Sequence, residues 1–282
     1  MSLSAVVKKD FRDSIRSHSL VSVTALFALF AAGLAAMQFV PTMYRDSGVE
    51  TSTLALLNSM RQPTVFFVPL VGLALSYRSI LGERESGSIK LLLGLPNARR
   101  DVVLGKFLGR TAVVAVSILA SYAVAGTVAL LTYDSFDFVV FALYTLLTLF
   151  YGAVYIGIGI GFSAVSKSRE WALAGAAALY ALFLVGWDVL LLLLQFAVVG
   201  PASELPESGL PDWMDFVGLL NPSSAFMKAT RAVIPEYREL TVFPEASALY
   251  LQDWFGFVIL AFWGGVPLYL GYRRFDGMDL QT

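Results

Sequence analysis

The sequence predicts an all-α integral membrane protein with six transmembrane helices, and three observations lead to this prediction. Of the 282 residues, 57% are hydrophobic and only 15% are charged, whereas a soluble domain has roughly 25% charged residues; the mean hydropathy is +0.70. Several apolar runs exceed the ~18 residues that mark a candidate transmembrane helix. Lys and Arg are distributed unequally among the connections between these runs, which predicts a defined orientation in the membrane.

Residues 3–16 are expected to form an amphipathic helix. Apolar side chains share one face and basic side chains the other, although Asp10 interrupts the apolar face. This pattern is typical of a helix that lies on a membrane surface. We therefore expect it on the inner surface; the alternative is a charged tail that precedes the first span.

Six apolar segments are expected to span the membrane. They cover about residues 20–40, 62–81, 107–132, 138–164, 171–200 and 254–272. Gly157 and Gly161 in the fourth segment form a small-xxx-small face, which favours close packing against another helix. The whole chain, 1–282, is expected to be a single transmembrane domain, and an even number of spans places both of its ends on the same side.

The positive charges indicate which side this is. With both ends inside, fifteen of the 20 Lys and Arg residues lie in inner connections, whereas the outer connections are acidic. Lys and Arg are enriched in cytoplasmic loops, so we expect a multi-pass protein of the plasma membrane with both termini in the cytoplasm. The long connection 201–253 then faces outward. Its prolines bracket a short helix, expected to start at Ser223 or Ser224, within an ordered outer cap before the sixth span.

Composition excludes several kinds of catalytic site. The chain has no Cys and one His, His18, so thiolate metal sites, Cys nucleophiles and His-based triads are excluded. We expect no enzyme, no metal site and no cofactor bound by this chain. Five Met residues lie near the outer side. Thioethers suit Cu(I), so these side chains either bind copper or simply fill apolar space in the packing. They are Met37, Met43, Met60, Met214 and Met227.

The longest charged interruption lies between the second and third spans, from Gly82 to Arg110. Gly82 and Gly87 have the spacing of a phosphate-binding P-loop, but Ser88 and Ile89 stand where that motif needs Lys and then Ser or Thr. Nucleotide binding at this segment is therefore not expected, and any ATP chemistry must take place on another chain.

A compact projection into the cytoplasm explains the same segment better. Gly87 is expected to adopt the left-handed conformation that ends a helix, and Ser88 to cap the next helix. That helix would cover residues 89–95 and be closed by Pro96. An ordinary inner loop would need neither the apolar run at 91–93 nor the Gly and Pro that bracket it.

Further along, Lys106 and Arg110 lie four residues apart on one helix face. We expect both to snorkel to the inner lipid headgroups.

This segment resembles the signature of ABC type-2 permeases, the membrane subunits of many ABC exporters. The residues that carry the resemblance are Glu83, Glu85, Gly87-Ser88, Leu92-Leu93, Pro96, Arg99 and Gly105-Lys106. It extends over the whole chain, which also has the N-terminal surface helix, the long outer connection and an Arg-Phe-x-x-x-Asp-Leu ending from Arg274 to Leu280. Leu220-Asn221-Pro222 is similar to the outer segment of the NosY-like branch, permeases tied to nitrous-oxide-reductase maturation.

The resemblance implies that this segment is the coupling helix that docks into a groove of a separate ATPase subunit. The implied coupling residues are Glu83, Glu85, Gly87, Ser88, Leu92, Leu93, Pro96, Arg99 and Lys106. The connection from Ser163 to Trp171 corresponds to a second ATPase contact, with Lys167, Arg169 and Glu170 as its residues. The family also implies ATP-driven transport, most often export, through a dimer of permease copies or close paralogues. ATP and Mg²⁺ would then be held by the ATPase chains, and no nucleic acid would be bound.

Asp188 is the one carboxylate inside an apolar segment. Such a group is a functional candidate by default, yet a helix from Trp171 to Asp188 rises about 26 Å at ~1.5 Å per residue, nearly the full hydrocarbon thickness. We therefore expect Asp188 at the outer interface, followed by a re-entrant segment over 189–199, with a place in the substrate pathway as the alternative.

Two other classes of function compete with an ABC permease. An ion-driven secondary transporter would favour broken helices and charges near the middle of the membrane, where only Asp188 qualifies. A membrane scaffold would bind an ATPase without transporting anything. The sequence does not indicate the substrate.

Overall fold

The computed structural model describes residues 3–15, 25, 27–29, 33, 52–89, 98–200, 210–241, 243 and 248–278. Within these residues the secondary structure is helical, without β-strand, as expected. Five stretches are long and apolar enough to cross a membrane: Thr53–Glu85, Arg99–Thr132, Phe138–Val165, Arg169–Val198 and Phe255–Asp276. They correspond to five of the six expected spans, and the remaining one, 20–40, lies almost entirely outside the described residues.

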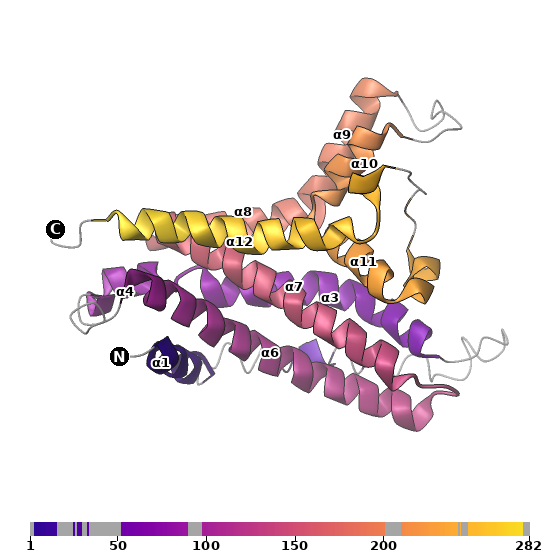
Figure 1. Ribbon diagram of the computed structural model, residues 1–282, viewed down its shortest axis with the longest axis horizontal. Helices are drawn as coiled ribbons and strands as arrows, with labels where there is room; N and C mark the ends of the chain where they lie inside the picture. Colours follow the sequence, from indigo (N-terminus) through magenta and orange to yellow (C-terminus); the bar gives the residue numbers. More distant parts are fainter. Residues whose placement is uncertain are drawn as a thin grey trace.

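Four long helices form a bundle that organises the described part of the chain (Figure 1). They are α3 (Thr53–Ser76), α6 (Arg99–Thr132), α7 (Phe138–Val165) and α12 (Phe255–Asp276). Helix α7 contacts the other three. Its buried residues include aromatic side chains that fill the core, so α7 is the central element of the bundle.

Buried hydroxyl groups connect three of these helices. The Tyr122 hydroxyl on α6 lies 2.6 Å from that of Thr64 on α3 and 3.2 Å from that of Thr148 on α7. Tyr144 on α7 donates to Thr64 at 3.3 Å. A buried polar group without a partner costs about 1–3 kcal/mol. These hydroxyls therefore favour the one arrangement of the helices in which all of them are paired.

Glycines allow α7 and α12 to approach closely. A Cβ atom on Gly157 would collide with the carbonyl oxygen of Gly264, and one on Gly161 would collide with that of Pro267. From the other side, a Cβ atom on Gly271 would lie 2.6 Å from the Cα atom of Gly161. The predicted close packing at Gly157 and Gly161 is confirmed, and α12 is its partner.

Helix α1 (Leu3–Ile15) crosses one end of the bundle and is seen nearly end-on in Figure 1. It packs on α6, where a Cβ atom on Gly105 would lie 2.8 Å from the Cβ atom of Val6. Val6 and Asp10 are both buried. Part of the face that we assigned to the membrane surface thus covers α6 instead.

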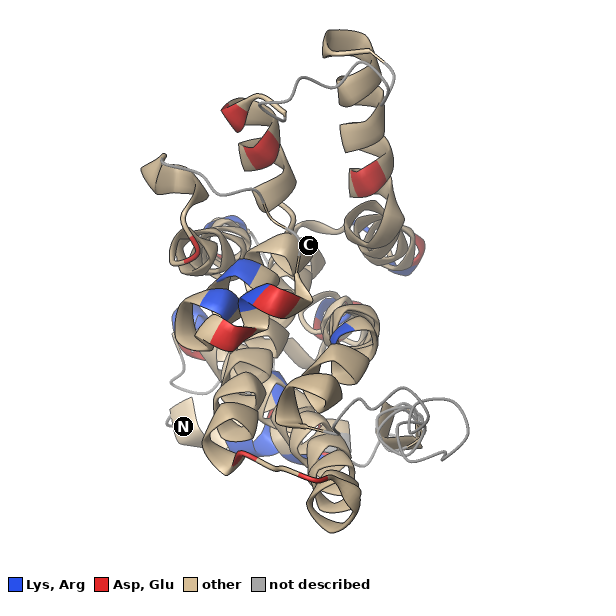
Figure 2. Ribbon diagram, turned by 90° about the vertical axis from the view of Figure 1, so that its right-hand side faces the viewer, with Lys and Arg blue, Asp and Glu red and all other residues tan. Residues whose placement is uncertain are grey.

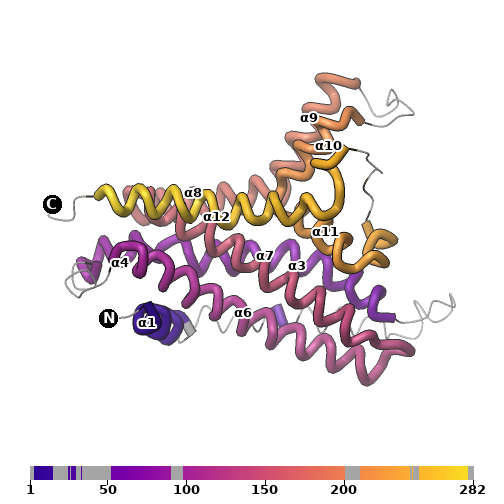
Figure 3. The backbone as a smooth tube through the Cα atoms, in the orientation of Figure 1, coloured from indigo at the N-terminus to yellow at the C-terminus, as the bar shows by residue number. Residues whose placement is uncertain are grey.

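The fifth expected span is bent. Helix α8 (Arg169–Ala181) runs along the bundle, a π-helical turn η2 (Leu182–Gly186) follows, and α9 (Trp187–Val198) then leaves the bundle (Figure 3). Single π-helical turns within α-helices commonly produce such kinks. The bend comes directly before Asp188, where the re-entrant segment was expected to begin.

The described part of the outer connection is an ordered cap at the other end of the bundle from α1. Its helices are α10 (Asp212–Leu219), α11 (Pro222–Val233), and the 3₁₀ turns η4 (Pro235–Leu240) and η5 (Leu249–Leu251). Helix α11 confirms the expected short helix, but its N-cap is Asn221, whose side chain accepts from the Ser223 amide at 2.9 Å. Ser223 and Ser224 lie in the first turn of α11, so the expectation that the helix starts near them is confirmed, and Asn221 before them has the extended conformation of an N-cap.

Asn221 also holds the bend. Its side-chain amide donates to the carbonyl oxygen of Phe183 in η2 at 2.9 Å. Nearby, the indole N–H of Trp187 donates to the carbonyl oxygen of Val217 at 2.9 Å, and that of Trp263 donates to Leu220 at 2.8 Å. The cap is therefore tied to α9, η2 and α12 by hydrogen bonds from side chains to backbone.

Candidate functional site

Most of the residues expected to contact an ATPase gather at one end of the bundle, called here the inner end. It carries α1, the short helix α4 (Leu81–Glu85), the turn between α7 and α8, and the C-terminal end of α12 (Figure 1). Residues 90–97 lie outside the described residues. The expected coupling helix, with Leu92, Leu93 and Pro96, therefore stays a prediction.

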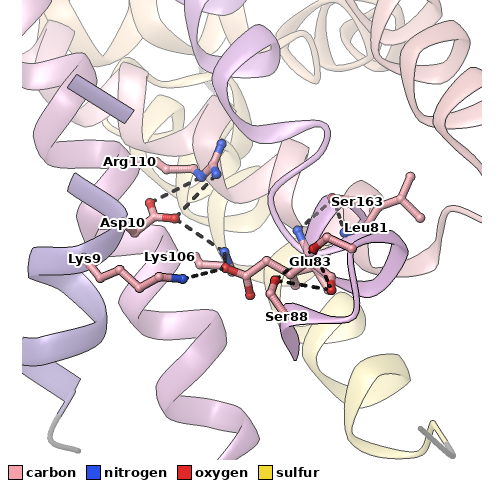
Figure 4. A network of polar contacts seen from close by, with 10 residues as sticks. Lys9, Asp10, Leu81, Glu83, Ser88, Lys106, Arg110 and Ser163 are labelled. Carbon is pink, nitrogen blue, oxygen red and sulfur yellow. Dashed lines mark hydrogen bonds and ion pairs between the residues drawn. The ribbon is translucent and has the colours of Figure 1, made fainter. Parts of the chain in front are cut away.

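A buried serine joins the two segments that were expected to contact the ATPase. The Ser163 hydroxyl on α7 accepts hydrogen bonds from the backbone amides of Ile80 at 3.1 Å and Leu81 at 3.2 Å (Figure 4). Arg84 donates to the carbonyl oxygen of Ser166 at 3.3 Å. Helix α4 is thus hydrogen-bonded to the end of α7 that leads into the turn at 166–168.

Glu83 and Lys106 are bonded to each other. The Glu83 Oε1 atom lies 2.8 Å from the Lys106 Nζ atom and 3.5 Å from that of Lys9 (Figure 4). The Lys106 side chain is only 3% exposed and also lies 3.4 Å from the Asp10 Oδ1 atom. Arg110 meets the other oxygen of Asp10, with 3.4 Å between Nε and Oδ2.

These contacts correct one expectation. Lys106 and Arg110 do not snorkel to lipid headgroups, because α1 covers this face of α6 and supplies the carboxylate of Asp10. We call Lys9, Asp10, Glu83, Lys106 and Arg110 the Asp10 cluster; it links α1, α4 and α6. Buried ions are tolerated only when they are paired in this way. The sequence did indicate this arrangement: Asp10 is an acid on the apolar face of an amphipathic helix, and such a residue, once buried, needs a cation on the helix that packs against it.

The turn after α4 has the predicted glycine conformation. Gly87 has φ +72°, and a Cβ atom there would meet nothing within 4 Å, so the backbone conformation, and not space, favours glycine. The Ser88 hydroxyl lies 3.5 Å from the Glu83 carbonyl oxygen and 3.0 Å from the Ser86 hydroxyl. Glu85 makes a partly exposed ion pair with Arg78 at 3.7 Å.

Arg99 binds the C-terminal end of α12. Its Nη1 atom donates to the carbonyl oxygens of Phe275 and Asp276 at 2.7 Å and of Met278 at 2.8 Å. The guanidinium also lies over the Phe275 ring, 5.7 Å from its centroid. The last carbonyl groups of a helix have no partner within that helix, so Arg99 caps α12. Sequence reasoning did not find this role, because the two residues that meet are far apart in the chain.

Replacing Arg99 with alanine is expected to free the last turn of α12. Because hydrogen bonds from a charged donor contribute about 1.5–3 kcal/mol, amide hydrogen exchange at residues 275–278 should accelerate markedly. Arg100→Ala is the matched control, since Arg100 is 72% exposed and, among the described residues, pairs only with its neighbour Asp101 at 3.7 Å. Equal exchange rates in the two variants would show that Arg99 is not the cap.

The second expected contact lies on the turn between α7 and α8. Lys167, Arg169 and Glu170 are exposed. Ser168 caps α8 by accepting from the Trp171 amide at 3.5 Å, and its hydroxyl donates to Glu170 Oε2 at 2.7 Å. Neither Lys167 nor Arg169 forms an ion pair with any residue that the structure describes. Both cations are therefore presented to the surroundings of the inner end.

The remaining candidates lie at the opposite end. Asp188 is in the first turn of α9 and lines two cavities beside α11. Met60 and Met214 are buried, and Met37 and Met43 fall outside the described ranges. Within those ranges no three His, Cys, Asp or Glu side chains come close enough to hold a metal ion.

Comparison with known proteins agrees with the resemblance found in the sequence. The model of a family described as ABC-2 family transporter proteins matches residues 4–280. The probable ABC transporter permease protein NosY of Pseudomonas aeruginosa is 29% identical over 276 residues, 96% of each chain. A protein of the same name from Stutzerimonas stutzeri is 26% identical over 225 residues, 78% of each chain.

Proposed function

Because this chain belongs to the ABC-2 family of transporter proteins, we propose that it forms the translocation path of an exporter as a dimer and is driven through its inner end by two ATPase subunits. Family membership makes it a multi-pass membrane subunit of an ABC transporter, a class that works with an ATPase partner and typically with a second permease copy. The two relatives named NosY favour the NosY-like branch.

One observation supports the inner end as the place where force enters. The Ser163 hydroxyl binds the backbone at Ile80 and Leu81, so the segment that follows α3 and the turn that follows α7 are joined. A displacement of either segment by the ATPase therefore reaches both α3 and α7. Through the pair of Glu83 and Lys106 it also reaches α6. ATP-driven closure of the ATPases would then tilt three helices together.

The exposed charges of the inner end indicate which charge the contacting surface of the ATPase should carry. Lys167 and Arg169 project from the turn between α7 and α8 without an ion pair to a described residue. A groove with acidic residues complements them. Glu83 and Lys106, by contrast, face each other, and in this proposal they transmit force within the permease.

Charge reversal of the turn tests this interface. The double variant Lys167→Glu/Arg169→Glu is co-expressed with its cognate ATPase subunit. The amount of ATPase that co-purifies with it is expected to fall about tenfold or more, because like charges placed together across an interface cost several kcal/mol. The matched control is Lys8→Glu/Arg12→Glu, which makes the same charge change on the exposed side of α1. Detergent size-exclusion profiles verify that both variants fold. If both retain as much ATPase as the wild type, the turn is not an ATPase contact.

A further inference from the structure

Two cavities adjoin at the outer cap, and Asp188 lines both. One, of about 360 Å³, lies between α9, α10 and α11. The other, of about 330 Å³, lies between α3, η2 and α11. Ser224 and Phe243 also line both cavities. Each is within the size range of ligand sites, ~300–1,000 Å³. Figure 2 views the molecule from this end and shows α9 and α10 rising away from the bundle, with acidic positions in red.

The cavities contain charges of both signs. Lys228 and Asp215 line the first cavity together with Asp188, and Arg61 lines the second. Lys228 is 5% exposed and its ammonium donates to the carbonyl oxygen of Leu251, while Arg61 donates to that of Leu240. Each cation thus keeps further donors for another partner.

Asp188 differs from these groups. Its side chain is exposed, and it makes no hydrogen bond or ion pair with any residue in the described ranges. A carboxylate placed at the junction of two cavities, without a partner among the described residues, can receive a cationic group from outside.

Lys228 is buried and Asp215 is partly buried in the wall of the first cavity. Burial raises the pKa of the Asp215 carboxyl, and it lowers the pKa of the Lys228 ammonium. The apolar lining includes Leu191, Met214 and Leu219. Ionic contacts are stronger beside buried groups than in water, which favours a contact between Lys228 and an anionic group of a ligand.

An apolar surface continues from the first cavity along α9. This helix has no buried residue, and Leu192, which lines the cavity, is 51% exposed. A ligand with an apolar chain can therefore extend from the cavity along α9. A simple anion would meet Asp188 and Asp215, and a simple cation would meet Lys228, so a headgroup with both charges matches the lining best.

We propose that the outer cavities bind the zwitterionic headgroup of an aminophospholipid of the outer leaflet. The ammonium group lies at Asp188, the phosphate lies toward Lys228, and an acyl chain follows α9. Binding of the lipid can be measured without transport or an ATPase, so a failure of this proposal is distinguishable from a failure of the proposed transport function.

Native mass spectrometry of the purified full-length protein tests the proposal with phosphatidylethanolamine and phosphatidylglycerol. Phosphatidylethanolamine is expected to bind at least about tenfold more tightly, because a charge-assisted hydrogen bond to Asp188 is lost with the anionic lipid. Asp188→Asn should remove this preference. It is isosteric and alters an exposed side chain, so folding is preserved. Glu239→Gln, an exposed carboxylate of η4 outside both cavities, is the control and should leave the preference unchanged.

A second variant tests whether the lipid binds in these two cavities by filling them with a larger side chain. Ser224→Phe places a large side chain in both cavities and should weaken phosphatidylethanolamine binding without altering charge. Soluble phosphoethanolamine distinguishes the source of the headgroup: if it competes as well as the lipid does, the site takes a soluble zwitterion and the lipid assignment is overturned. Equal binding of the two lipids by the wild type, or an unchanged preference in Asp188→Asn, would overturn the proposal itself.

Discussion

Replacing Lys106 with methionine is expected to destabilise the protein by about 3–5 kcal/mol, the range found when one partner of a buried ion pair is removed. The Lys106 ammonium lies 2.8 Å from Glu83 and 3.4 Å from Asp10, so its loss leaves two carboxylates without their shared cation. Methionine keeps most of the apolar stem, which restricts the change to the charge. The thermal midpoint in detergent, followed by size-exclusion chromatography, measures the effect.

The same variant is expected to weaken coupling between permease and ATPase. If the Asp10 cluster positions α4, loss of the Lys106 cation should lower the ATP hydrolysis that the permease or its substrate stimulates in the ATPase subunit. This decrease should be seen even at temperatures where the variant is folded. A double-mutant cycle with Glu83→Gln separates the pair from its surroundings, because the two changes together should cost less than their sum.

Glu85→Gln provides the matched control for the Asp10 cluster. Glu85 belongs to the same short helix, but its ion pair with Arg78 is longer, at 3.7 Å, and partly exposed. Exposed pairs contribute about 0–1 kcal/mol. A small effect of Glu85→Gln beside a large effect of Lys106→Met supports a structural network inside the permease. Similar small effects in both would mean that the Asp10 cluster carries little stability.

Patterns along the chain were sufficient to predict most of the helices. Apolar runs of sufficient length marked the five spans that the structure describes, because a membrane core accepts only long apolar helices. Local rules also sufficed where a feature depends on adjacent residues. Gly87 has the left-handed conformation expected of a helix end, and prolines bracket α11 as expected.

Features that depend on distant partners were missed. Periodicity indicates which face of α1 is apolar but not that α6 covers it, so Lys106 was assigned to the lipid headgroups. Arg99 was assigned to the ATPase contact through the family resemblance, and nothing in that resemblance indicates that it meets backbone carbonyls of the last helix. The bend at η2 has no proline to mark it, and it is held by Asn221 through a hydrogen bond to Phe183. In each case the deciding contact joins segments that no local pattern connects.

The packing of α7 against α12 should show the other large effect. Gly161→Leu places a side chain against the backbone of Pro267, which cannot rotate away as a side chain can. We expect a loss of about 3 kcal/mol, the upper end of typical overpacking costs, measured as a lower thermal midpoint. Gly265→Leu is the control, because a Cβ atom there would meet nothing within 4 Å and leucine favours helix over glycine. Equal midpoints for the two variants would mean that α12 moves away from α7 at little cost, and close contact at Gly161 would then not hold the last helix in the bundle.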